Sequence, residues 1–143
     1  ISPAWYGYVA AQIVLNTPML FSNTPVSKYF ILGSSGTKNA IDKHHIFPKN
    51  YLTRIGFDSD RDRNQIANFT YLDYATNIEI SDKAPSEYVA LYRQKLGEAG
   101  YRKACEEHAL PENFESMKYA DFLSQRRLLM AQIICKAYKQ LCE

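Results

Sequence analysis

The segment DKHHIFPK, residues 42–49, is the part of the chain on which the expected fold and chemistry depend. It contains His44 and His45, two of the three histidines in the chain. Neighbouring residues of a β-strand point to opposite faces, so the two imidazoles cannot chelate one ion together unless the strand ends or bends there. Pro48 supplies such an end, because proline cannot continue a strand ladder. One imidazole can then face a metal and the other a substrate, although two structural histidines remain the simpler interpretation of this segment alone.

The residues around this segment predict a short β-hairpin inside a mostly helical α+β domain. Residues 41–46 and 69–72 have the pattern of short strands, and residues 58–63 (DSDRDR) that of a charged loop. Helical spacing of apolar residues, with proline or glycine at the ends, predicts helices over residues 3–16, 48–52, 74–80, 85–96, 101–109 and 118–141. Gly97 and Gly100 are both expected to interrupt the helical pattern.

Length and composition fit one ordinary globular domain. The chain has 143 residues, of which 46% are hydrophobic and 22% charged, and a formal net charge of +2. No apolar run is long enough to cross a bilayer. The three cysteines form no CxxC pair, which favours free thiols in a reducing compartment. Because the chain begins with Ile1 rather than methionine, we expect it to be a fragment of a longer protein.

Two asparagines extend the pattern beyond the histidines. Asn68 stands directly before the second predicted strand, and Asn77 lies in the helical turn that follows that strand. The order His-His, Asn, strand, Asn resembles the HNH (ββα-metal) nuclease family, including the HNH domain of CRISPR effector nucleases. HHIFPKNYL, IANFTYLDYATN and ISDKAPSEYV together resemble the C-terminal nuclease half of GmrSD-type modification-dependent restriction proteins. The matching part spans residues 41–89, about a third of a single domain covering residues 1–143.

The resemblance implies a role for each of these residues. His44 and Asn77 would be the metal ligands, and His45 would be the general base that activates water. Asn68 would be structural, its amide tying the loop that orients His45. Many HNH enzymes have histidine at the third position, where this chain has Asn77. An amide oxygen there favours Mg²⁺, or Mn²⁺, over zinc.

These residue types suit phosphodiester hydrolysis. A histidine that titrates near neutral pH can take a proton from water, and a divalent ion can stabilise the charge that develops on phosphate and leaving oxygens. Lys43, Lys49, Arg54 and Lys83 surround the motif in sequence and would suit sequence-independent phosphate contacts. For any one of them, an ordinary solvated charge is the simpler interpretation.

Other polar residues have structural interpretations. His108 is expected at a surface or helix end, and Arg126 and Arg127 on a solvated helix face. Asp42 and Asp73 flank the strands, and either could orient a histidine or serve a turn. The Asn68-Phe69-Thr70 sequon is a chance match.

The sequence therefore predicts a metal-dependent DNA endonuclease domain that acts in defence against foreign DNA. The resemblance implies a bacterial cytoplasmic protein whose separate N-terminal domain recognises modified DNA and uses a nucleotide. Two copies would have to pair to cut both strands at once, so a homo-oligomer is possible. The alternatives are an inactive HNH-fold module that only binds DNA, and a structural zinc domain, which the lack of four closely spaced Cys or His ligands disfavours.

Overall fold

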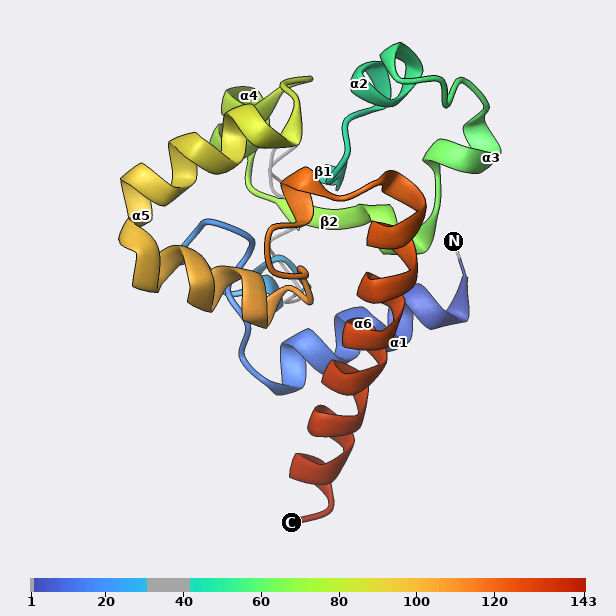
Figure 1. The fold of residues 1–143 in the computed structure, drawn as a ribbon. Coiled ribbons are helices and arrows are strands. Elements are labelled where there is room, and N and C mark those ends of the chain that lie inside the picture. The colour runs from blue at the N-terminus through green and yellow to red at the C-terminus, as the bar shows by residue number, and fades with distance from the viewer. Residues whose placement is uncertain (1, 31–41) are drawn as a thin grey trace.

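A two-stranded antiparallel sheet lies in the middle of the molecule and helices surround it (Figure 1). The computed structural model describes residues 2–30 and 42–143. Strand β1 (Asp42–His45) pairs with β2 (Phe69–Leu72), in a register that places His44 opposite Thr70 and His45 opposite Phe69. The predicted mostly helical α+β class and both strands are confirmed, while Ile41 lies outside the described residues.

The N-terminal helix and the long C-terminal helix pack against each other. Helix α1 (Pro3–Val14) begins as predicted at Pro3, and the Ser2 hydroxyl accepts a hydrogen bond from the Trp5 backbone N–H. It ends two residues before the predicted end, and a 3-10 helix, η1 (Val26–Phe30), follows a loop. Helix α6 (Tyr119–Leu141) crosses α1 and packs against it, and its C-terminal end extends away from the sheet (Figure 1).

The segment between the strands is more helical than predicted. Helix α2 (Lys49–Arg54) follows Pro48 and stops before Gly56, as expected. The prediction of a loop over residues 58–63 is wrong in part, because α3 (Asp60–Arg63) forms one helical turn. The hydroxyl of Ser59 caps this turn by accepting a hydrogen bond from the Asp62 N–H. Serine is a favoured N-cap residue, so Ser59 was a sequence signal for this helix that the prediction did not use. A short 3-10 helix, η2 (Ile66–Asn68), then leads into β2.

Helix α4 (Tyr74–Ile80) follows β2 at once, and the Asp73 carboxylate caps it by accepting from the Thr76 N–H at 2.8 Å. Helix α5 (Pro85–Glu107) has a kink at Gly97, where φ is 73° and ψ is 162°. Gly97 therefore interrupts the helix as predicted, whereas Gly100 stays helical, and that prediction is wrong. The 3-10 helix η3 (Phe114–Ser116) connects α5 to α6.

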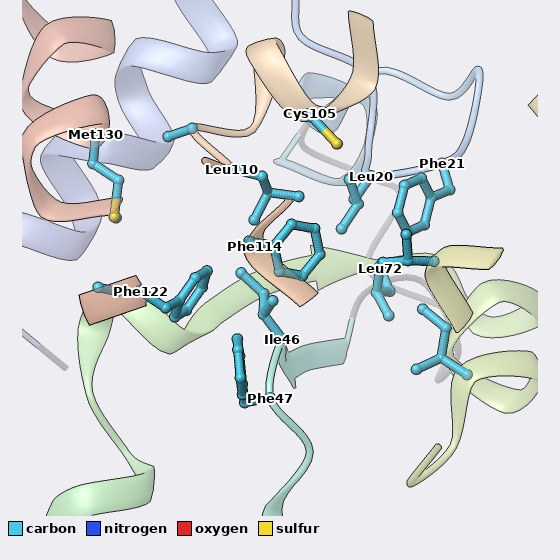
Figure 2. Packing of buried hydrophobic residues seen from close by; sticks show 14 of the residues in the cluster. Leu20, Phe21, Ile46, Phe47, Leu72, Cys105, Leu110, Phe114, Phe122 and Met130 are labelled. Carbon is cyan, nitrogen blue, oxygen red and sulfur yellow. The ribbon is translucent and has the colours of Figure 1, made fainter. Parts of the chain in front are cut away.

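An aromatic cluster fixes the chain just after the two histidines. Phe47 is 1% exposed, and its ring centroid lies 4.6 Å from that of Phe122 on α6 and 5.4 Å from that of Tyr119. Figure 2 shows Phe47 and Ile46 in the same buried region as Phe114 and Phe122. Burying such side chains stabilises the fold by about 1.5–3 kcal/mol each. The end of β1 is thereby anchored to α6, far away in sequence.

One prediction of an exposed polar residue is wrong, and a second is confirmed only in part. Arg126 is fully buried, and its guanidinium donates to the carbonyl oxygens of Ala67 (2.9 Å), Phe69 (2.6 Å) and His108 (3.2 Å). His108 does lie at a helix end, but it is buried, and its Nε2–H donates to the Pro18 carbonyl oxygen at 2.7 Å. These side chains bond to backbone carbonyls from distant segments, which helical periodicity cannot predict. Leu141, at the end of α6, is 69% exposed.

Candidate functional site

Strand β1 carries the two candidate histidines and ends at the second of them. His44 and His45 are half-buried, and their alternate directions follow from the strand geometry. The N–H of Ile46 still bonds to the Asn68 carbonyl oxygen at 2.8 Å, and the chain then leaves the sheet through Pro48 into α2. Strand β1 therefore ends before Pro48, as the sequence predicted.

His45 lies against Phe69 and is hydrogen bonded to Asn64. The Nε2 of His45 is 2.7 Å from Oδ1 of Asn64, and its ring centroid is 4.7 Å from that of Phe69. Partial burial lowers the pKa of His45, and the charges of Lys49, Lys43 and Arg63 lower it further, while the hydrogen bond to Asn64 opposes the shift. A lowered pKa favours neutral imidazole at neutral pH, the form that can accept a proton.

Asn68 connects the segment after His45 to the segment before Asn64. Its side chain is fully buried, with Oδ1 accepting from the Phe47 N–H at 2.8 Å. Its Nδ2 donates to the carbonyl oxygens of Phe47 and Arg63, both at 3.1 Å. One amide thus satisfies three backbone groups and holds two loops together. This burial also leaves the amide inaccessible for glycosylation in the folded state.

His44 and Asn77 come from adjacent elements. Helix α4 packs against β1, and Asn77 lies half-buried in that helix, with its backbone N–H bonded to the Asp73 carbonyl at 3.0 Å. An imidazole nitrogen and an amide oxygen are both suitable metal ligands. Within the described ranges 2–30 and 42–143, no group of three or more His, Cys, Asp or Glu residues could hold a metal ion. Two such donors would leave most positions of a divalent ion to water or substrate.

The carboxylate of Asp73 caps the N-terminus of α4. It was one of two residues expected either to orient a histidine or to serve a turn, and the cap agrees with the second alternative. The side chain of the other, Asp42, lies outside the described part of the structure.

The four basic residues predicted to contact phosphate are all exposed. Lys43 lies over the Phe69 ring, with Nζ 4.4 Å from the centroid, and so stands beside His45. Lys49 forms an ion pair with Asp60 at 3.3 Å, and Lys83 Nζ donates to the Glu79 carbonyl at 2.6 Å. The guanidinium of Arg54 lies 5.8 Å from the Tyr51 ring centroid. Each keeps its charge at the surface, where phosphate could be bound.

Asn64 is the residue of this site that the sequence did not reveal. It ends the helical turn α3, nineteen positions after His45 and directly after residues 58–63, which were expected to be a charged loop. Asparagine is common at helix ends and turns. Its presence after a run of charged residues therefore gives no local indication of a hydrogen bond to a histidine. Only the hydrogen bond in the folded chain identifies it.

A large pocket in the described part of the chain lies elsewhere. It has a volume of about 660 Å³ and lies between the second half of α5 and α6, with Tyr101, Cys105 and Leu129 among its lining residues. None of the candidate site residues contributes to its wall.

No protein-family model matches the chain, and no curated protein and no solved structure matches it either. Among the described residues, no helix is long and apolar enough to cross a membrane.

Proposed function

We propose that this chain is a metal-dependent DNA endonuclease domain of the HNH (ββα-metal) type. The observation that carries the proposal is the arrangement of four side chains on β1, on η2 just before β2, and on α4. His44 and His45 end the first strand, Asn68 precedes the second, and Asn77 lies on the helix packed against the first. The order of elements and the buried bonds of Asn68 support it.

His45 is the general base. Its lowered pKa favours the neutral form, and its neighbourhood is cationic, as a phosphodiester substrate requires. Neutral imidazole removes a proton from water while the resulting hydroxide attacks phosphorus, and the bond from phosphorus to the leaving oxygen breaks. The leaving oxygen then takes a proton from solvent.

His44 and Asn77 are the residues that would hold a divalent cation, with Mg²⁺ preferred and Mn²⁺ an alternative. When bound, such an ion supplies charge stabilisation for the phosphate and the leaving oxygen. The exposed side chains of Lys43, Lys49, Arg54 and Lys83 bind flanking phosphates, which gives affinity without sequence preference.

The setting of the domain is part of the same proposal. The resemblance to GmrSD-type proteins supports a role in bacterial defence, with recognition of modified DNA residing in a separate N-terminal domain. Pairing of two copies would allow both strands to be cut.

Cleavage of supercoiled plasmid tests the proposal. Wild-type protein is compared with His45→Ala, His44→Ala and Asn77→Ala, in Mg²⁺, in Mn²⁺ and in EDTA, with Asn50→Ala as an exposed control outside the site. We expect metal-dependent nicking that His45→Ala abolishes and Asn50→Ala leaves unchanged.

Two other experimental results would favour the alternative functions over a nuclease. DNA binding without cleavage, on modified and unmodified plasmid alike, would identify an inactive binding module. Tightly bound zinc without nuclease activity would indicate a structural metal domain instead.

A further inference from the structure

We propose that Asn64 is a positioning residue for His45: its side-chain carbonyl holds the imidazole in the tautomer that carries hydrogen on Nε2, which leaves Nδ1 to accept the proton from water. The inference rests on the proposed function and specifies which atom of the base reacts. It comes from the contact between Asn64 Oδ1 and His45 Nε2, 2.7 Å apart.

The chemistry of this contact fixes the position of the hydrogen. An amide oxygen can only accept, so the imidazole nitrogen facing it must be the donor. Neutral histidine carries one ring hydrogen, and with Nε2 protonated the lone pair is on Nδ1. When Nδ1 takes a proton from water, the Nε2–H bond to Asn64 is kept, and the imidazolium strengthens it. The acceptor therefore favours the charged state formed during the reaction without supplying an opposite charge.

Asn64 is well suited to hold a ring because its own backbone is fixed. Its N–H bonds to the Asp60 carbonyl at 2.8 Å at the end of α3. The two carbonyls before it are also held, that of Asp62 by the Tyr119 hydroxyl at 2.6 Å and that of Arg63 by Asn68 at 3.1 Å. The side chain is exposed, but the peptide that carries it is attached to α6 and to η2.

The same amide of Asn68 holds both partners. It bonds to Phe47, two residues after His45, and to Arg63, the residue before Asn64. Asn68 therefore fixes the spacing of the two segments that carry the base and its acceptor, and Asn64 uses that spacing to orient the ring. Asn64 acts through His45 and has no proposed contact with substrate.

Nuclear magnetic resonance of the whole chain, with ¹⁵N-labelled histidine, tests the tautomer directly. The spectrum has only three histidines to assign, and His45→Ala identifies the signals of His45. We expect wild-type protein to show a slowly exchanging Nε2–H proton on His45. Asn64→Ala should lose that signal, whereas Asn64→Asp, which keeps an acceptor oxygen, and Asn50→Ala, a matched exposed asparagine, should retain it.

Kinetics then test the role. Asn64→Ala is expected to lower kcat by about 10- to 100-fold with KM for DNA unchanged, because orientation of the base is lost while binding is not. An unprotonated Nε2 in the wild type, or a kcat for Asn64→Ala equal to that of Asn50→Ala, would overturn the inference. If the wild type cleaves no DNA, the proposed function fails, and the resonance measurement still decides whether Asn64 sets the tautomer. Thermal melting of each variant shows whether it is folded.

Discussion

Asn68→Ala should destabilise the domain far more than any exposed asparagine does. The substitution removes three hydrogen bonds, one to the Phe47 N–H and two to the carbonyls of Phe47 and Arg63. Asn68 is fully buried, so water cannot replace the lost partners without rearrangement.

The expected loss follows from the bond count. At about 1 kcal/mol for each bond, the free energy of unfolding falls by about 3 kcal/mol, a large share of the roughly 5–15 kcal/mol of an ordinary domain. For a chain of this size, each kcal/mol lowers Tm by about 3 °C, so Tm should fall by about 10 °C. Asn68→Asp keeps the acceptor but sets a carboxylate oxygen against two carbonyl oxygens, and should cost at least as much.

Urea unfolding followed by circular dichroism measures the effect, with Asn64→Ala and Asn50→Ala as exposed controls. Each control should change the free energy of unfolding by about 0.5 kcal/mol or less. A loss below about 1 kcal/mol in Asn68→Ala would refute the reasoning, because the three bonds could then not be what joins the two loops.

Three further perturbations test the buried polar groups and the thiols. Arg126→Met should lower the free energy of unfolding by about 2–4 kcal/mol, because three backbone carbonyl oxygens lose their buried donor; urea unfolding that matches the wild type would contradict this. Burial lowers the pKa of His108 to about 4, so the unfolded chain binds the extra proton first as the pH falls. Stability should therefore decrease by about 3 kcal/mol between about pH 6.5 and pH 4, and His108→Gln should show a shallower pH dependence. Burial also raises the pKa of Cys105 to about 11, so a thiol reagent at neutral pH should modify the exposed Cys135 and Cys142 in native protein and Cys105 only after unfolding; rapid reaction of all three would contradict the burial.

The sequence by itself predicted the local elements with few errors. Alternating and helical patterns, with Pro3, Pro48 and Gly97 as boundaries, determine the two strands and most helices because these signals act within a few residues. The sequence likewise placed the two histidines on the first strand, Asn68 directly before the second strand and Asn77 on the following helix, although it did not predict the 3-10 helix that contains Asn68. Gly100 was predicted incorrectly because helix packing overrides the weak preference of a single glycine.

Only the tertiary structure decided which polar groups from distant segments form hydrogen bonds with one another. Arg126 and His108 have the local pattern of surface residues, yet they are buried because unpaired carbonyls of Ala67, Phe69 and Pro18 need donors. The contact of Asn64 with His45 is of the same kind, because it exists only when α3 folds back onto the end of β1. Local pattern reports the burial preference of a residue, whereas hydrogen-bond partners depend on which segments the folded chain brings together.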